Sequence, residues 1–381
     1  MDSTAANDKY NTKPFLHLAF EMGNKQWKVG STIGLGQAPR LRTITAGDLP
    51  QLRDEIGRAK RRFGLEEKVR VVSCYEAGRD GFWLHRYLLS EGIENIIVDS
   101  ASLEVNRRKR KVKTDRVDAG KLLTMLLRYH SGEPKVWHVV RVPSLQQEDG
   151  RQLHRELSSL KTERTRHINR IKGLLVSQGV RLEIKKDFPK QVNAAKLWDG
   201  SPLPPGIKTR VLREFARIQL VNQHIKELET ERRQAIRTAT DPQTEMIRRL
   251  LCLRGIGPTS AWLFVKEFFG WRQFRNRRQV GALAGLTPTP YQSGDSYREQ
   301  GIDKAGNRHI RAIAIEIAWA WLRFQPDSTL SRWYQQRFGH GNSRMRRIGI
   351  VALARKLLIA LWRYLETGEV PEEVVFKSAP A

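Results

Sequence analysis

The sequence predicts an α/β domain followed by a mostly helical (all-α) region. Its first part carries short apolar runs of strand length, which come first and then alternate with helical stretches. That order is expected of a mixed sheet packed against helices. From about residue 145 the apolar residues instead recur every three or four positions, which is the period of helices. The change of period divides the chain into two differently built parts.

Five apolar segments of the first part are expected to form strands: residues 15–20, 26–33, 41–45, 69–75 and 93–98. The fourth segment, VRVVSCY, is rich in β-branched residues and nearly continuous, as a strand buried on both faces should be. Helices are expected at residues 48–63, 81–90 and 115–129. Together these elements predict one layered domain over residues 15–135, preceded by a flexible tail at residues 1–14.

The central region, residues 136–245, contains two apolar seams with coiled-coil spacing. The first seam consists of Leu153, Leu157, Leu160, Arg164, Ile168, Ile171 and Leu175, and the second of Leu212, Phe215, Ile218, Val221, Ile225 and Leu228. A segment rich in Pro and Gly separates them at residues 199–207. Two long helices around such a break predict an antiparallel hairpin or a dimerising stalk, although core packing alone would also explain the seams.

The third region, residues 246–345, opens with a Gly-Ile-Gly turn between two expected helices, the pattern of a helix-hairpin-helix. Arg254 precedes the turn, and Gly255 and Gly257 would let backbone N–H groups approach a phosphate. An ordinary tight turn has the same pattern, but the arginines nearby favour a DNA contact. The segments that follow are expected to be a loop at 291–304, helices at 307–324 and 345–367, and a loose tail after residue 371. Residues 346–381 thus form a C-terminal helix and tail.

The balance of charge indicates a polyanionic partner. Lys and Arg number 68 and Asp and Glu 40 among 381 residues, so the net charge is +28 and the isoelectric point about 10.5. Such an excess repels itself unless phosphates are near, and each phosphate contact is favoured by counterion release. Hydrophobic residues, at 40%, are sufficient for real cores, which excludes a disordered polyelectrolyte. Ribosomal, chromatin and nucleic-acid-processing proteins all fit this composition.

The sequence shows none of the signals of secreted or membrane proteins. Its N-terminus is polar, and its longest apolar stretch is too short to span a bilayer. The two cysteines, Cys74 and Cys252, are too few for a disulfide framework or a Cys-rich zinc site. We therefore expect a soluble, cytoplasmic protein.

A cluster of basic residues lies between the last expected strand and the last helix of the first domain. The segment 106–113 reads NRRKRKVK and supplies Arg107, Arg108, Lys109, Arg110, Lys111 and Lys113. A solvated loop is the simplest interpretation. In a chain of net charge +28, beside the acidic residues described next, nucleic-acid binding is favoured.

Four acidic residues, Glu21, Glu76, Asp115 and Asp118, occupy positions that suit a metal site. Glu21 follows the first apolar run, Glu76 ends the most strand-like segment, and the two aspartates lie three apart at a helix start. Carboxylates can hold two Mg²⁺ ions about 4 Å apart for phosphate chemistry. Each acid alone could be an N-cap, a surface charge or an edge-strand charge. Their combined layout is that of an RNase H-like nuclease, in which a sheet presents acids to metal ions.

Longer motifs give the sequence a specific resemblance. They are KTDRVDA at residues 113–119, RGIGPTSA at 254–261, GLTPTPYQSG at 285–294 and GIDKAGNRHIR at 301–311. With the acidic layout and the central helices, the chain resembles the DEDD-type insertion-sequence transposases of the IS-one-ten family, which are described as bridge-RNA-guided serine recombinases. The resemblance covers about residues 15–365. It implies an RNase H-like (Holliday-junction-resolvase-like) N-terminal domain, central coiled-coil helices and a transposase domain with a catalytic serine at 246–345.

The resemblance also implies a two-part active site. The four acids would bind Mg²⁺, and Ser293 would attack the DNA phosphate. The family usually has Asp where this chain has Glu21. Without the resemblance, Ser260 and Ser296 would be equal candidates for the serine. Basic residues that follow Ser293 and would stabilise the transition state are Arg298, Lys304, Arg308 and Arg311.

The implied function is excision and insertion of DNA, with double-stranded donor and target read through a structured non-coding bridge RNA. Composite active sites in the family imply a homo-oligomer, a dimer or tetramer, working at the bacterial or archaeal nucleoid and not at a membrane. One rival is a metal-dependent, structure-specific (Holliday-junction-type) nuclease in which Ser293 is only structural. Another is a non-catalytic nucleic-acid-binding protein, whose binding would survive replacement of Asp115 and Asp118. A protein–DNA adduct that depends on Ser293 separates the recombinase from the nuclease.

Overall fold

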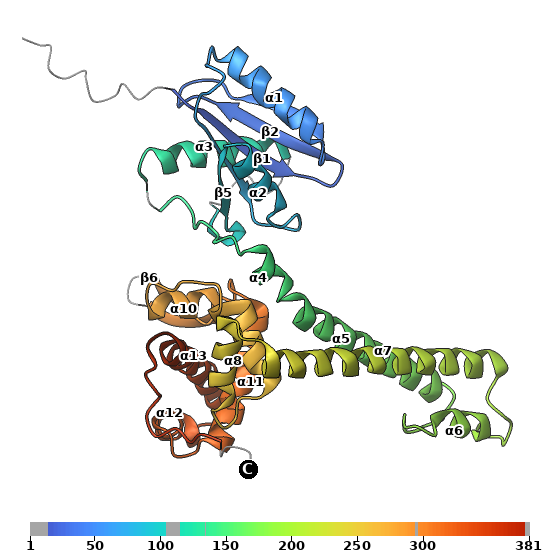
Figure 1. The fold of residues 1–381 in the computed structure, drawn as a ribbon. Helices are drawn as coiled ribbons and strands as arrows, with labels where there is room; N and C mark the ends of the chain where they lie inside the picture. Colours follow the sequence, from blue (N-terminus) through green and yellow to red (C-terminus); the bar gives the residue numbers. More distant parts are fainter. Residues whose placement is uncertain (1–13, 104–114, 134, 294–295, 378–381) are drawn as a thin grey trace, which may run out of the picture. The chain divides into compact units, whose positions relative to one another are not determined.

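The computed structural model describes residues 14–103, 115–133, 135–293 and 296–377 (Figure 1). The chain divides into two compact units, Met1–Val142 and Pro143–Ala381. The tail expected at residues 1–14 lies outside the described residues, except for Pro14. In the described part of the chain, no helix combines the length and the apolar character needed to cross a bilayer.

The first unit is built on a five-stranded mixed sheet, as predicted. Its strands are β1 (Leu16–Met22), β2 (Gln26–Thr32), β3 (Arg40–Thr45), β4 (Val71–Glu76) and β5 (Glu94–Val98). Their order across the sheet is β3-β2-β1-β4-β5. β1, β2 and β3 form an antiparallel meander, whereas β4 runs parallel to β1 and β5 parallel to β4. The carboxyl ends of β1, β4 and β5 therefore share one edge of the sheet.

Helices cover both faces of this sheet: α1 (Leu49–Arg62), α2 (Trp83–Ser90) and α3 (Asp115–His130). α1 begins where expected because Asp48 caps it, its Oδ1 accepting a hydrogen bond from the N–H of Gln51. Alternate side chains of β1 point to opposite faces. Phe20 packs in the core that also contains residues of α1 and α2, whereas Ala19 packs in the core that contains α3. The sheet is thus a central layer between helices, which explains why its strands are apolar on both sides.

The first unit extends to Val142, beyond the boundary expected at residue 135. The additional segment pairs with β5. Val139 forms a bridge with Val98, and the N–H of Val140 donates to the carbonyl of Ile97 at 2.7 Å. A segment with so few ladder bonds leaves no readable alternation in the sequence, and the domain boundaries expected from the sequence stay predictions. The second unit combines the remaining central helices, the expected transposase domain and the C-terminal helix.

The second unit begins with α4 (Leu145–Asp149) and the expected pair of long helices, α5 (Gln152–Val176) and α7 (Pro205–Thr238), with α6 (Phe188–Ala194) in the connection (Figure 1). The pair is antiparallel, because Lys161 Nζ lies 2.9 Å from Glu229 Oε1 and Arg164 Nη1 lies 3.4 Å from Asn222 Oδ1. The two apolar seams pack against each other in the cores of the pair. The prediction of an antiparallel hairpin is confirmed, and the dimerising stalk stays a prediction.

The remainder of the second unit is a helical body. Its elements are α8 (Pro242–Leu251), α9 (Pro258–Phe264), η3 (Val265–Phe269), α10 (Arg277–Leu283), α11 (Arg308–Phe324), α12 (Thr329–Tyr334), η4 (Gln335–Gly339) and α13 (Ser343–Thr367). Apolar side chains of α8, α9, α11 and α13 form a common core. α11 and α13 are the helices expected at 307–324 and 345–367, and Asn307 and Asn342 cap their N-termini.

A hairpin replaces the loop that was expected at residues 291–304. β6 (Pro288–Ser293) and β7 (Ser296–Ile302) pair antiparallel, with Tyr291 opposite Arg298 and Ser293 opposite Ser296. The sequence predicts a loop because the segment is polar and contains Gly and Asp. That prediction is wrong, since the structure has two paired strands there. Tyr291 and Tyr297, which lie on the two strands, are residues that favour strands.

The C-terminal tail is packed, contrary to the expectation that it would be loose after residue 371. Phe376 forms a bridge with Leu253, and the N–H of Arg254 donates to the carbonyl of Val375 at 3.2 Å. Lys377 Nζ lies 2.7 Å from the carbonyl oxygens at both ends of the turn between α8 and α9, those of Leu251 and Ile256. These bonds join distant parts of the chain, so no local pattern in the tail predicts them.

Candidate active site

Glu21 and Glu76 lie on neighbouring strands at the carboxyl edge of the sheet. β1 and β4 are parallel, and Phe20 pairs with Tyr75. Each glutamate is the next residue on its strand, so their Cα atoms are about one strand spacing, 4.8 Å, apart. Both side chains are half-buried. The structure therefore brings together the two acids that the sequence had placed at strand ends.

The two glutamates lie on the face of the sheet that α3 covers. Side chains alternate along a strand, so Glu21 shares a face with Ala19 and Glu76 shares a face with Cys74. Ala19 and Cys74 both pack in the core that contains α3. The Sγ atom of Cys74 lies 3.8 Å from the carbonyl oxygen of Leu122 on α3. Any group bound by the glutamates would thus meet this helix.

α3 runs antiparallel to β1, so its first turn lies at the carboxyl edge. Its last residue, His130, has its ring 5.9 Å from that of Phe15, which precedes β1. Leu122 is level with Cys74, two residues before Glu76. Two strand residues advance about 7 Å, a distance that a helix covers in about four to five residues. Counting back from Leu122, the level of the glutamates falls between Asp115 and Asp118.

The backbone of Asp115 and Asp118 lies in the first turn of α3, whereas their side chains lie outside the described residues, so their role as ligands stays a prediction. Two carboxylates side by side favour a cation near them, and carboxylate oxygens are the ligands that Mg²⁺ prefers. Glu21 and Glu76 fit such an ion. Among the described side chains, no group of three or more His, Cys, Asp or Glu is close enough to hold a metal ion.

One further acid at this edge was not predicted. Asp99 directly follows β5, whose last residue, Val98, pairs with Glu76. The N–H of Asp99 donates to the carbonyl of His138 at 2.9 Å, and its side chain is half-buried. The signal in the sequence was an acid immediately after the strand segment IENIIV, the same signal that pointed to Glu76.

Ser293 belongs to the second unit, where it is the last residue of β6. The side chains of Ser293 and Arg298 lie outside the described residues. The loop after the hairpin packs closely: a Cβ atom on Gly306 would lie 2.2 Å from the backbone nitrogen of Gly285. Only glycine fits there. Arg311 reinforces the loop, because its Nη1 donates to the carbonyls of Ala284, Lys304 and Gly306 at 3.0 to 3.5 Å.

The Gly-Ile-Gly turn connects α8 and α9, as a helix-hairpin-helix requires. Gly255 has a φ of +90°, in the left-handed region that favours glycine. The N–H of Gly257 donates to Ser260 Oγ at 3.2 Å, so this group is engaged within the protein. Arg254 is exposed. The phosphate contact expected from this turn stays a prediction, and among the described atoms Arg254 is better placed for it than Gly257.

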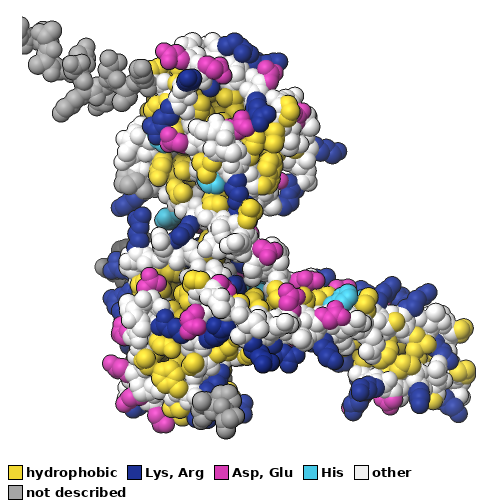
Figure 2. Space-filling model, viewed as in Figure 1, with side chains coloured by type: hydrophobic (Ala, Val, Ile, Leu, Met, Phe, Trp, Pro, Cys, Tyr) yellow, Lys and Arg dark blue, Asp and Glu magenta, His cyan; other side chains and the backbone are white. Residues whose placement is uncertain are grey.

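Arg308 shares a groove with basic side chains of α5. Lys and Arg are prominent over this helical pair (Figure 2). The groove has a volume of about 770 Å³ and lies between α5 and the start of α11. Its cations are Arg155, Arg166, Arg170 and Arg308, and Glu163 also lines it. Arg155 and Arg170 are paired with Glu267 and Glu214, which leaves Arg166 and Arg308 as the more available cations. The sequence could not place the outer positions of α5 beside Arg308, because more than 130 residues separate them (308 − 170 = 138).

Arg232 is a buried cation that the sequence did not reveal. Its side chain lines a neighbouring groove of about 510 Å³ between α5, α7 and α9. Its Nε and Nη1 atoms are buried without a hydrogen-bond partner, and burial lowers its pKa. His154 lines the same groove, and burial lowers its pKa to about 4, so it is neutral at pH 7. Within α7, Arg232 is one charge among many, so nothing local marks it.

The basic segment expected to bind nucleic acid lies outside the described residues. It comprises Arg107, Arg108, Lys109, Arg110, Lys111 and Lys113. In the described parts, Lys304 is exposed and has a φ of +60°, and Arg308 is exposed at the start of α11. The roles of all these cations in nucleic-acid binding stay predictions.

The chain is similar to known proteins over nearly its whole length. Residues 247–335 match the Transposase IS116/IS110/IS902 family. Over 376 residues the chain is 40% identical to the "Putative transposase y4rJ" of Sinorhizobium fredii, and the match covers 95% of each chain. The chain belongs to this transposase family. It is therefore an insertion-sequence transposase, and DNA is the partner that this activity implies.

Other relatives of this transposase carry similar names. It is 31% identical over 230 residues to the "Probable family 20 transposase" of Pseudomonas aeruginosa, covering 59% of this chain and 66% of the relative. It is 25% identical over 308 residues to the "Transposase for insertion sequence element IS1111A" of Coxiella burnetii, covering 79% of each. The family match at 247–335 contains the Gly-Ile-Gly turn, Ser293 and Arg308, whereas the acidic edge lies in the first unit.

Proposed function

We propose that this transposase breaks and rejoins DNA by attack of the Ser293 hydroxyl on a phosphodiester, assisted by Mg²⁺ at the acidic edge of the first unit. The observation that carries the proposal is the placement of Glu21 and Glu76 in register on one face, beside the first turn of α3. The sheet order β3-β2-β1-β4-β5 supports an RNase H-like unit. Within that unit, Asp115 and Asp118 complete the proposed set of four ligands.

The proposed step exchanges one phosphorus–oxygen bond for another. The Ser293 oxygen bonds to phosphorus and loses its proton to water or a base, while the bond to one sugar oxygen breaks. That sugar oxygen takes up a proton and leaves as a hydroxyl. Attack by a sugar hydroxyl of a second strand reverses these events, frees the serine and restores a phosphodiester. Mg²⁺ held by the four acids would polarise the phosphate as a Lewis acid.

Guidance by a structured bridge RNA is part of the proposal, as is a dimer or tetramer with composite active sites. The basic groove around Arg308 supports a protein that grips backbones and leaves sequence recognition to base pairing. The acids belong to the first unit and Ser293 to the second.

A covalent-adduct assay tests the proposal. The full-length protein is mixed with its flanking RNA, DNA of the element junction and Mg²⁺, and denatured samples are examined for protein–DNA species. We expect an adduct in the wild type and none in Ser293→Ala or Asp115→Ala. Ser296→Ala is the matched control, because Ser296 lies opposite Ser293 in the hairpin, and it should retain the adduct.

The same assay distinguishes the nuclease alternative. Cleavage without an adduct, unchanged in Ser293→Ala but lost in Asp115→Ala, would show a metal-dependent nuclease. Binding of DNA without cleavage under any condition would leave only a nucleic-acid-binding protein.

A further inference from the structure

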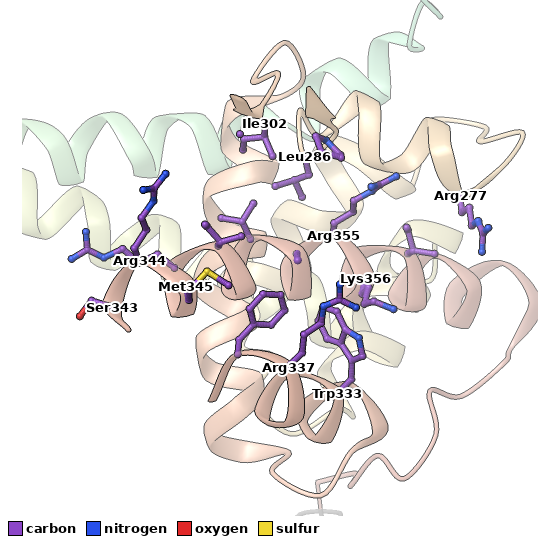
Figure 3. A pocket seen from close by; sticks show the side chains of 18 of the residues that line it. Arg277, Leu286, Ile302, Trp333, Arg337, Ser343, Arg344, Met345, Arg355 and Lys356 are labelled. Carbon is purple, nitrogen blue, oxygen red and sulfur yellow. The ribbon is translucent and has the colours of Figure 1, made fainter. Parts of the chain in front are cut away.

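A groove lies in the helical body of the second unit (Figure 3). Its volume is about 1180 Å³. The side chains that line it come from α13, from α10, and from α12 together with η4. The base of the β6–β7 hairpin completes the wall through Pro288, Gly301 and Ile302. The hairpin whose first strand ends at Ser293 thus adjoins this groove.

The charged side chains that line the groove are all positive. Its cations are Arg277, Arg278, Arg337, Arg344, Arg347, Arg355 and Lys356, and none of the described residues that line it is acidic. In the described part of the chain, none of these seven forms an ion pair. Arg355 Nε is buried without a hydrogen-bond partner. A ligand that carries several negative charges would satisfy this set.

The floor between the cations is apolar and uncovered. Met345 and Ile348 are 42% and 44% exposed. With Ala352 they follow one face of α13 at intervals of three and four residues, whereas Leu353 and Leu357 on another face are buried in the core. Trp333 adds an aromatic ring, with Lys356 Nζ 4.6 Å from its centroid. Figure 3 shows Arg344, Arg355 and Lys356 around this floor.

We infer that this groove binds a single strand of DNA, with phosphates on the basic rim and unpaired bases on the apolar floor. Proteins that bind single strands combine a basic groove with apolar or aromatic surfaces on which bases stack. A duplex hides its bases, so it would use the rim and leave the floor empty. DNA is chosen as the occupant because the chain is a transposase. The inference needs only DNA as a partner, so it stands apart from the serine and metal chemistry.

Fluorescence anisotropy with labelled oligothymidine of about 12 nucleotides tests the rim. The full-length double variant Arg344→Gln/Arg347→Gln is compared with Arg346→Gln/Arg363→Gln. Both pairs remove two positive charges from α13, but Arg346 and Arg363 do not line the groove. We expect only the first pair to weaken binding severalfold and to reduce the slope of log K against log salt by about 1.4, or 0.7 for each lost phosphate contact.

A second variant, Met345→Ser/Ile348→Ser, tests the floor without changing charge. Both positions are exposed, so the fold should persist, which circular dichroism checks. We expect weaker binding of the oligothymidine and unchanged binding of a duplex of equal length. Three results would overturn the inference: equal effects of the two arginine pairs, no effect of the floor variant on single strands, or a floor-dependent preference for single-stranded RNA. A fourth result, a change of oligomeric state in the floor variant, would identify the groove as a contact between copies and would likewise overturn the inference.

Discussion

Glu76 is the residue on which the proposed metal site depends most. It shares a face and a register with Glu21, and substitution with Gln would keep its size while removing its charge. We expect Glu76→Gln to reduce Mg²⁺-dependent DNA cleavage by on the order of 100-fold, because charge stabilisation by a metal contributes several kcal/mol. Glu21→Asp keeps the charge and should retain activity. Cleavage rates with Mg²⁺ measure both, and an active Glu76→Gln would contradict the metal site.

Glu214 provides a stability prediction at the same scale. It is buried in the α5–α7 pair, where His167 Nδ1, Arg170 and Arg217 lie 2.5 to 3.0 Å from its oxygens. Burial alone would raise its pKa, but these hydrogen bonds and charges hold the pKa below its ordinary value. We expect Glu214→Gln to lower the free energy of unfolding by about 2 kcal/mol at pH 7, because a buried carboxylate loses the charge that its hydrogen bonds to the half-exposed Arg170 and Arg217 depend on.

The pH dependence follows from the direction of this pKa shift. A carboxyl with a lowered pKa in the folded state stabilises fully above its unfolded pKa, near about 4.3, and loses that contribution as the pH falls through its folded value. Urea unfolding of wild type and Glu214→Gln should therefore converge in acid. Glu163→Gln, at an exposed partner of His167, is the control and should change stability little. A constant difference between wild type and Glu214→Gln down to pH 2 would contradict the assignment.

At the scale of elements, the turn between α8 and α9 shows how a local conformation supports packing. Gly255 has a φ of +90°, and a Cβ there would contact Phe324 and Ala320 at ordinary distances. The cost of Gly255→Ala is therefore backbone strain, and we expect a loss of about 1 kcal/mol in the free energy of unfolding. Gly173→Ala in α5 meets no atom within 4 Å and should instead stabilise by about 0.5 kcal/mol. Chemical denaturation measures the free energy of unfolding of both variants. A similar loss of stability in both would contradict backbone strain at Gly255 as the cause.

The pairing of two strands is also what the sequence does not predict at residues 288–302. The strands of the hairpin β6–β7 carry little apolar alternation, so the sequence predicts a loop where the structure has two paired strands. The long helices α5 and α7 have strong seams and were predicted. Long helices can be predicted because their apolar residues recur at a regular spacing over many turns. Short polar strands lack such a pattern, and they form only because a partner strand pairs with them.

At the scale of the whole molecule, the net charge of +28 predicts strongly salt-dependent DNA binding. We expect the logarithm of the binding constant for duplex DNA to fall with the logarithm of salt concentration with a slope of at least about 5, as for six or more phosphate contacts. Titrations between about 0.05 and 0.2 M salt measure this slope. A slope near 1 would mean that most of the cations face solvent and not DNA.

The sequence by itself determined the mixed sheet, the two long central helices, the helices α11 and α13, and the basic net charge. It also located Glu21 and Glu76 at strand ends. These features depend on periodicity, capping residues and composition, which are local or additive properties of the chain. The transposase family that the sequence motifs indicate is the family to which the chain belongs.

Only the tertiary structure decided which residues share a site. It placed Glu21 and Glu76 in register on the α3 face and grouped Arg308 with the cations of α5. It also packed the C-terminal tail against the α8–α9 turn, and it formed a groove along α13 with an apolar floor and a basic rim. Each of these contacts joins residues far apart in the chain, and their approach depends on the packing of whole elements. No pattern within a single segment contains that information.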